Sequence, residues 1–309
     1  MTNALAGRVA LVTGGGRGIG RAIAEALHAG GAAVVIADNG TSIDGTGADP
    51  SVAQGVAEAL GERATSFTES IASPSAAQTA VELAVRRFGG LDIVVNAAAI
   101  LRDGFVFKAE PGNWDAVLRT NLSAAFHVLA AATPVMREQA KANRGGSPYA
   151  WGRIVNIVST AGLYGNYGQG AYASAKAGLV GLTRVVALDM ARAQVTANAV
   201  APFAATRVTE TIKPANPAQA TYKERALKVP ARAVGELVAW LAGPEAKGVT
   251  GQLFGVRGRE IFLFSQPRPV ARLVNPGAEG LGAAIASALA PQYVGPETDL
   301  EAFSSEPLV

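Results

Sequence analysis

The first forty residues contain the pattern that most constrains the fold. A short apolar run at residues 8–12 is followed by a glycine-rich stretch at 13–20, by a helical pattern that ends near Ala29, and by a second apolar run at 33–37. Both runs are apolar throughout, as expected for strands that are covered on both faces. A strand, a glycine turn, a helix and a second strand in this order begin a βαβ unit, so we expect a parallel sheet.

The alternation of strand-like and helical segments continues along the chain without an internal repeat or a linker. After residue 40, the strand-like runs are 64–68, 91–95, 153–158, 194–200 and 251–256, and the helical patterns are 51–60, 74–88, 111–142, 171–190 and 231–241. This pattern predicts the α/β class, with a Rossmann-type doubly wound parallel sheet of about seven strands and helices on both faces. Residues 1–265 would form a single domain. Residues 266–309 lack a core pattern and would be a C-terminal extension packed on that domain or on a neighbouring subunit.

Composition excludes several classes of protein and site. With 49% apolar and 17% charged residues, the 309-residue chain is expected to be globular. The absence of cysteine excludes disulfides and thiolate metal sites. The net charge is +3, and the Lys and Arg residues are scattered along the chain, which argues against a nucleic-acid partner. There is neither a signal-peptide pattern nor an apolar run of the roughly 18 residues that a membrane span needs, so we expect a cytoplasmic protein. His28 and His127 lack partners at ligand spacing, so no metal site is expected.

The glycine-rich stretch favours a dinucleotide site. Gly14, Gly18 and Gly20 allow a tight turn and a close approach of the backbone to a pyrophosphate, at the positive end of the following helix. Asp38 lies 24 residues after Gly14 at the end of the second strand, where a carboxylate can accept hydrogen bonds from a ribose diol and would repel a 2′-phosphate. This favours NAD over NADP, although Arg17 could meet a phosphate. Asp38 could instead be a turn former beside the Asn-Gly pair that follows it.

A second group of polar residues lies around a strand end in the other half of the chain. Tyr172 and Lys176 are four residues apart, so on a helix they share a face, and Ser159 ends the preceding strand-like run. A phenol, an ammonium and a hydroxyl that converge in this way make a proton-transfer site. We expect the Lys176 charge to lower the pKa of Tyr172, and Ser159 to hold a carbonyl or hydroxyl oxygen beside the phenol.

Two further residue types allow more than one interpretation. Asn121 lies inside the helical pattern 111–142, where an Asn usually points to solvent, so on its own it would be a surface residue. Phe105, Phe107 and Phe203 lie near predicted strand ends or loops. These rings could line an apolar acyl or ring pocket, or they could pack in the core.

Together these motifs resemble the short-chain dehydrogenase/reductase family over roughly residues 5–260. The matching elements are the glycine stretch 13–20, Asp92 with 96–99, Asn121, Ser159, and Tyr172 with Lys176. The resemblance implies that Tyr172 is the general acid/base, that Lys176 lowers its pKa and binds the nicotinamide ribose, that Ser159 positions the substrate oxygen, and that Asn121 holds a water in a proton relay. It also implies a set of cofactor-binding residues: Gly14, Arg17, Gly18, Ile19, Gly20, Asp38, Ser70, Ile71, Asn96, Ala98, Tyr172, Lys176, Pro202 and Ala205.

A narrower resemblance concerns the substrate. Residues 100–103, 164–169 and 201–211, and less diagnostically 262–270, look like the dehydrogenase part of peroxisomal multifunctional enzymes of fatty-acid β-oxidation and their bacterial single-domain relatives. That relation implies NAD, a (3R)-3-hydroxyacyl-CoA substrate and a homo-oligomer, either a tetramer or a dimer. The substrate pocket would then include Tyr164, Asn166, Tyr167 and Phe203.

The chain also departs from the family pattern. Ala97 and Ala99 replace an Asn and a Gly, Ser70 replaces an acid, Phe203 replaces a Gly, and Arg257 and Arg259 stand where Asp and Gly are common. These changes put the affinity for the cofactor in question and leave other functions open. One is an NADPH-dependent 3-oxoacyl reductase or a steroid or polyol dehydrogenase on the same scaffold. The other is a binding protein that senses a dinucleotide without turnover.

Overall fold

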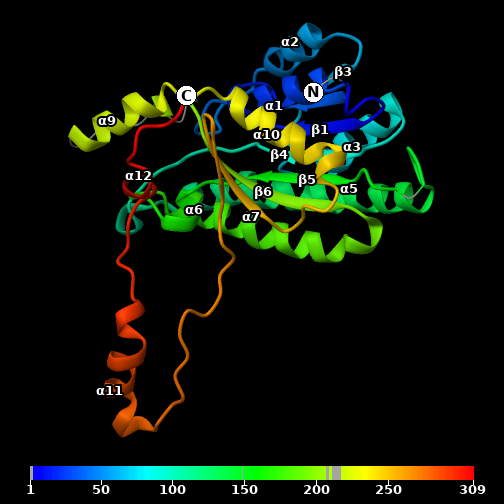
Figure 1. The fold of residues 1–309 in the computed structure, drawn as a ribbon. Coiled ribbons are helices and arrows are strands. Elements are labelled where there is room, and N and C mark those ends of the chain that lie inside the picture. The colour runs from blue at the N-terminus through cyan, green and yellow to red at the C-terminus, as the bar shows by residue number, and fades with distance from the viewer. Residues whose placement is uncertain (1–2, 148, 207–208, 211–216) are drawn as a thin grey trace.

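The computed structural model describes residues 3–147, 149–206, 209–210 and 217–309, and it confirms the predicted α/β architecture (Figure 1). One eight-stranded sheet has the order β3-β2-β1-β4-β5-β6-β7-β8. The strands are β1 (Val9–Thr13), β2 (Ala33–Ala37), β3 (Ala64–Phe67), β4 (Ile93–Asn96), β5 (Arg153–Ile157), β6 (Thr196–Phe203), β7 (Leu253–Arg257) and β8 (Glu260–Leu263). The first seven strands run parallel. β2 and β3 are added on one side of β1 and β4 to β8 on the other, so the strand order reverses between β1 and β4.

The prediction of a parallel sheet of about seven strands needs one correction at its edge. β8 is an eighth strand, and it pairs antiparallel with β7 through a tight hairpin at Gly258, which has φ +58°. Ile261 and Leu263 share the solvent-facing side of this strand and are 61% and 64% exposed. Residues 261–264 form a short apolar run in the sequence, but a run of this length does not reveal that it pairs antiparallel at the edge of the sheet.

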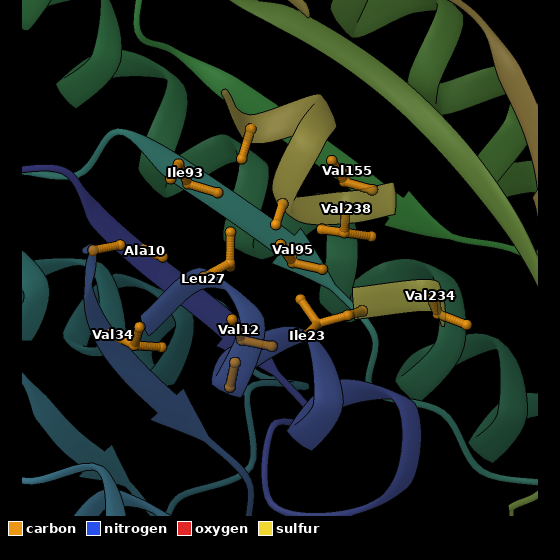
Figure 2. Close-up of a cluster of buried hydrophobic side chains, with 14 of the residues drawn as sticks. Ala10, Val12, Ile23, Leu27, Val34, Ile93, Val95, Val155, Val234 and Val238 are labelled. Carbon is orange, nitrogen blue, oxygen red and sulfur yellow. The ribbon is translucent and has the colours of Figure 1, made fainter. Parts of the chain in front are cut away.

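Helices cover both faces of the sheet. One face carries α1 (Gly18–Ala29), α2 (Ser51–Leu60) and α10 (Arg232–Ala242), and Figure 2 shows their core with Val12, Leu27, Val95 and Val238 at its centre. The other face carries α3 (Pro74–Phe88), α5 (Ala124–Lys141) and α7 (Gly170–Asp189). α3 presents buried alanines to the sheet, which lets the helix pack close to the strands.

A buried ion pair anchors the amino ends of the strands, opposite the edge where motifs were expected. The fully buried carboxylate of Asp92 accepts a hydrogen bond from the Val9 N–H at 2.9 Å and pairs with the Arg144 guanidinium at 2.6 Å. A carboxylate buried without such partners would be strongly destabilising. Asp92 therefore has a structural role in joining β1 to β4.

The long helical pattern 111–142 is interrupted. α4 (Pro111–Leu118) and α5 are joined by one π-helical turn, Arg119–Ser123, in which the Ala124 N–H bonds to the Arg119 carbonyl. A π turn inserts an extra residue and rotates the side chains that follow it, and such turns occur frequently at functional sites. Asn121 lies within this turn.

The C-terminal segment divides into two parts (Figure 1). After β8 the chain leaves the domain and forms α11 (Ala278–Ala288), of whose residues none is buried. It then returns, and the short helix α12 (Asp299–Ala302) lies beside α6 (Ala161–Tyr164). Between β6 and α10, α9 spans Pro217–Ala226. Arg207, Val208 and Thr211 of the substrate-related motif 201–211 lie outside the described residues.

Candidate active site

A cavity of about 260 Å³ opens at the carboxyl ends of the strands, where the order reverses between β1 and β4. Open α/β sheets bind ligands at this position. The β1–α1 turn, the ends of β2 and β3, the segment after β4, and α7 form its walls. The predicted residues that line it are Gly14, Arg17, Gly18, Ile19, Gly20, Asp38, Ser70, Ile71, Ala98, Tyr172, Lys176 and Pro202.

The glycine turn brings two backbones closer than a side chain would allow. Gly14 has φ +65°, and a Cβ there would lie 2.8 Å from the Ala98 backbone. A Cβ on Gly20 would lie 2.0 Å from the Gly14 carbonyl oxygen. The first turn of α1 can therefore approach the cavity with its free N–H groups and the positive end of its dipole, which suits a pyrophosphate.

Asp38 is part of the turn and also lines the cavity. Its carboxylate accepts hydrogen bonds from the Gly16 N–H at 3.0 Å and the Gly40 N–H at 2.8 Å, so it does stabilise the turn. It also lines the cavity at the end of β2, where its remaining lone pairs can accept from a diol. Arg17 donates to the backbone carbonyls of Gly40 and Thr41 at 3.2 and 3.0 Å, which ties the glycine turn to the loop after β2.

Ser159, Tyr172 and Lys176 converge as their spacing predicts. Ser159 follows β5, and its Oγ accepts a hydrogen bond from the Ala161 N–H at 3.2 Å; the hydroxyl lies near enough to the Tyr172 phenol to lower its pKa. The Lys176 ammonium lies 5.7 Å from the centre of the Tyr172 ring and donates to the Ile157 carbonyl at 2.7 Å. Lys176 is only 2% exposed, so its position is fixed by the surrounding strand and helix.

The pKa of Tyr172 is shifted in the direction opposite to the one expected from Lys176 alone. Burial raises the pKa of the phenol to about 12, the Ser159 hydroxyl opposes that shift, and the negative charges of Asp299 and Asp103 add to it. Burial also lowers the pKa of Lys176 to about 8. For both groups burial is the largest cause of the shift, because it disfavours the charged form. At neutral pH the phenol is therefore a proton donor, and higher pH favours its action as a base.

Asn121 is a buried residue, so the surface interpretation based on residue type alone is wrong. It is 1% exposed, its Oδ1 accepts from the Ile100 N–H at 2.8 Å, and its Nδ2 donates to the Ile100 carbonyl at 2.9 Å. The π turn directs this side chain toward the segment after β4. The two bonds to Ile100 fix the orientation of the Asn121 amide.

Two predicted cofactor residues, Asn96 and Ala205, are not among the described residues that line the cavity. Asn96 turns toward β5, and its Nδ2 donates to Asn156 Oδ1 at 2.9 Å; Asn156 in turn donates to the Thr183 hydroxyl at 2.8 Å. This chain of bonds joins the sheet to α7 despite the absence of an amide at Ala97. Ala205 follows β6, and its N–H donates to the Val229 carbonyl.

The four residues predicted for the substrate pocket are not among the described residues that line the cavity. Tyr164 and Phe203 contact the ring of Phe303, Asn166 donates to Asp299, and Tyr167 is 74% exposed. Three of them have Asp299 or Phe303 as a neighbour. These two residues were not predicted, because they lie a hundred residues or more further along the chain and belong to no recognisable motif. The only local signal there is the Thr298–Glu301 capping box that begins α12.

Comparison with known proteins gives the family. The short chain dehydrogenase model matches residues 8–219. The chain belongs to this family. A solved short chain dehydrogenase from Mycobacterium avium shares 34% identity and a TM-score of 0.78, covering 96% of this chain and 98% of its own. This short-chain dehydrogenase is therefore an oxidoreductase that acts on CH–OH groups and uses a nicotinamide dinucleotide.

Relatives of this dehydrogenase include enzymes of acyl metabolism. Hydroxyacyl-CoA dehydrogenase ChsB1 of Mycobacterium tuberculosis is 35% identical over 100% of this chain and 95% of its own length. The 3-oxoacyl-acyl-carrier-protein reductase FabG of Vibrio cholerae is 36% identical over 82% of this chain and 97% of its own. Peroxisomal multifunctional enzyme type 2 of Drosophila melanogaster is 38% identical over 67% of this chain, which spans 33% of that enzyme. The predicted resemblance to the hydroxyacyl-CoA dehydrogenase group is thus confirmed.

Among the described residues, no group of three or more His, Cys, Asp or Glu side chains is arranged to hold a metal ion. Within the same residues, the helices are either too short or too polar to cross a membrane.

Proposed function

We propose that this protein is an NAD-dependent dehydrogenase that interconverts (3R)-3-hydroxyacyl-CoA and 3-oxoacyl-CoA. The observation that carries the proposal is the similarity to a hydroxyacyl-CoA dehydrogenase over the whole chain, including the C-terminal segment beyond the family model. The convergence of Ser159, Tyr172 and Lys176 beside the cavity supports an oxidation or reduction of a secondary alcohol.

The residues around the cavity fit a dinucleotide. The close crossing at Gly14 and Gly20 leaves the space that a pyrophosphate needs, and the start of α1 supplies N–H donors. Asp38 would hold the adenosine ribose, and Ser70 and Ile71 would border the adenine end. Lys176 and Pro202 line the opposite end, where the nicotinamide ribose would lie. Bound NAD would supply the acceptor for the hydride that leaves carbon 3 of the substrate.

This chain's own residues would handle the proton. In the oxidative direction the Tyr172 oxygen takes the proton of the substrate hydroxyl while carbon 3 loses its hydride, and in reduction Tyr172 returns that proton. Ser159, whose hydroxyl lowers the pKa of the same phenol, would hold the substrate oxygen. The ammonium of Lys176 would stabilise the phenolate, which burial otherwise disfavours.

Asp38 supports NAD over NADP. Its carboxylate would lie where NADP carries a 2′-phosphate, so two negative charges would face each other. Arg17 offers little compensation, because its guanidinium already donates to Gly40 and Thr41. The similarity to a 3-oxoacyl-acyl-carrier-protein reductase favours a second candidate, a reductase of 3-oxoacyl substrates on the same site. The arrangement of Ser159 and Tyr172 argues against a binding protein without turnover.

The experiment is a substrate panel followed at the absorbance band of NADH. (3R)- and (3S)-3-hydroxyacyl-CoAs of several chain lengths, steroid alcohols and polyols are offered with NAD and, separately, with NADP. The proposal expects turnover of the 3R series with NAD. Turnover of 3-oxoacyl substrates only with NADPH would support the reductase, and turnover of steroids or polyols alone would contradict the acyl-CoA substrate. A cytoplasmic location and a homo-oligomeric state stay predictions.

A further inference from the structure

The last residues of the chain return to the loop that joins Ser159 to Tyr172. Asp299, the first residue of α12, is only 8% exposed. Its Oδ2 accepts a hydrogen bond from the Thr160 hydroxyl at 2.9 Å, and its Oδ1 accepts one from Asn166 Nδ2 at 3.2 Å. Figure 1 shows α12 against α6, at the carboxyl edge of the sheet.

These two hydrogen bonds hold the loop at both ends. Thr160 directly follows Ser159, and Asn166 lies six residues before Tyr172. Between them are α6 and Gly165, which has φ +90° and would not by itself fix the path of the chain. A single buried carboxylate therefore joins both arms of the loop to a segment that is distant in the sequence.

An aromatic cluster lies beside this contact. The ring of Phe303 lies 4.6 Å from Phe203, 5.5 Å from Phe262, 5.8 Å from Tyr164 and 6.3 Å from Phe264, measured between ring centres. These four rings come from the end of β6, from β8 with the residue after it, and from α6. Phe203 directly follows Pro202, which lines the cavity, so the cluster begins one residue beyond the cavity lining along β6.

The contacts of the tail also account for two departures from the family pattern. Phe203, in a position where Gly is common, forms the closest ring contact with Phe303. Arg257, in a position where Asp is common, is 5% exposed and donates to the carbonyls of Phe303 and Ser305, each at 3.0 Å. Arg259 contributes only its N–H, which donates to the Leu308 carbonyl at 2.7 Å. Nothing in the structure explains its side chain.

We propose that the segment 299–305 is part of the substrate site, with Asp299 as a positioning residue for the loop 160–169 and Phe303 as the wall that limits the length of the acyl chain. The role of Asp299 holds for any substrate that Ser159 and Tyr172 bind. The role of Phe303 rests on the proposed acyl-CoA substrate. An apolar wall made of five rings suits an alkyl chain better than a polyol.

The test of Asp299 uses the full-length protein with two substitutions and one control. Asp299→Ala should lower kcat at least 10-fold and leave the NADH dissociation constant within 2-fold, because the loop joins Ser159 to Tyr172 and does not line the cavity proposed for the dinucleotide. Asp299→Asn, which can still accept from Thr160, should recover part of that loss. Glu297→Ala removes an exposed carboxylate two residues away and should leave kcat unchanged. Loss of NADH binding in step with kcat would overturn a positioning role.

The pH profile provides a readout that mere loosening of the loop would not change. Two carboxylates, those of Asp299 and Asp103, raise the pKa of Tyr172, and the Lys176 ammonium also faces its ring at 5.7 Å. Asp299→Asn removes one of the two carboxylates, so the rising limb of the oxidation rate should move to lower pH. Burial raises the pKa of Asp299 as well, which is why the comparison is made above neutral pH. An unchanged profile, or a shift to higher pH, counts against the proposed contact.

The test of Phe303 is the series of 3-hydroxyacyl-CoAs. Phe303→Ala should move the optimum of kcat/KM to longer acyl chains. Tyr293→Ala, which removes a 68% exposed ring from the C-terminal extension outside the segment 299–305, should not. An identical chain-length profile in Phe303→Ala overturns the assigned wall. If the wild-type protein oxidises another alcohol instead, the acyl-CoA proposal fails, but the Asp299 variants are still decisive with that alcohol. Amide hydrogen exchange of residues 160–169, expected to be faster in Asp299→Ala than in Glu297→Ala, tests the contact without turnover.

Discussion

Replacing Asp38 by Asn tests the choice between NAD and NADP. The carboxylate is held at the end of β2 by the N–H groups of Gly16 and Gly40, so it cannot swing away from a phosphate bound beside it. Two unit charges about 4 Å apart repel by about 4 kcal/mol at an effective dielectric constant near 20. Because Asp38 is half-buried, exposure to solvent reduces this to roughly 1–3 kcal/mol, or about 5- to 150-fold in affinity.

The expected result is that Asp38→Asn reduces the preference for NAD over NADP by that factor. Fluorescence titration with NADH and NADPH measures it directly, and the preference of the wild-type protein should also weaken as salt is added. Asn can accept at only one oxygen, so the loss of one bond to the turn should lower stability by about 1 kcal/mol. Asp49→Asn, which removes an exposed carboxylate further along the same loop, is the matched control. A wild-type preference for NADPH, or an unchanged ratio in Asp38→Asn, would refute the reasoning.

Two further predictions concern the glycine turn and the proton donor. Gly14→Ala should lower the free energy of unfolding by about 1–3 kcal/mol and weaken NADH binding at least 10-fold, since φ is +65° and the new Cβ would lie 2.8 Å from the Ala98 backbone. Gly112→Ala in α4, where no atom lies within 4 Å, is the control for thermal melting and titration; equal effects in both variants would contradict the argument. Ser159→Ala removes the hydroxyl that lowers the pKa of Tyr172, so the oxidation rate should rise at a higher pH than in the wild type. A shift to lower pH in that variant would show that the hydroxyl favours the phenol instead.

The sheet and the cofactor side of the cavity were predictable because their signals are local. The runs that became β1, β2, β4 and β5 are mostly Val, Ile and Ala, and almost every residue in them is buried, as expected for strands covered on both faces. The glycine turn and Asp38 lie within one βαβ unit, so their positions relative to one another follow from its geometry. The same applies to Tyr172 and Lys176, which one turn of α7 brings together.

The features that were missed depend on contacts between distant segments. Asn121 points inward because the π turn after α4 rotates it toward Ile100, and residue type alone does not reveal such a turn. The pKa of Tyr172 is raised where a lowering was predicted, because burial is the largest cause of the shift and the spacing of residues does not reveal burial. Asp299 and Phe303 reach the site only because the chain leaves the domain, forms α11 and returns.

The central claim is that Tyr172 transfers the proton while a (3R)-3-hydroxyacyl-CoA is oxidised with NAD. The most direct measurement is the rate of NADH formation from that substrate by the wild-type protein and by Tyr172→Phe, together with the NADH dissociation constant of each. Loss of a general acid/base lowers kcat by about 10²–10⁴-fold, and the account predicts a loss of this size with NADH affinity retained within 2-fold. Near-normal turnover by Tyr172→Phe would contradict it.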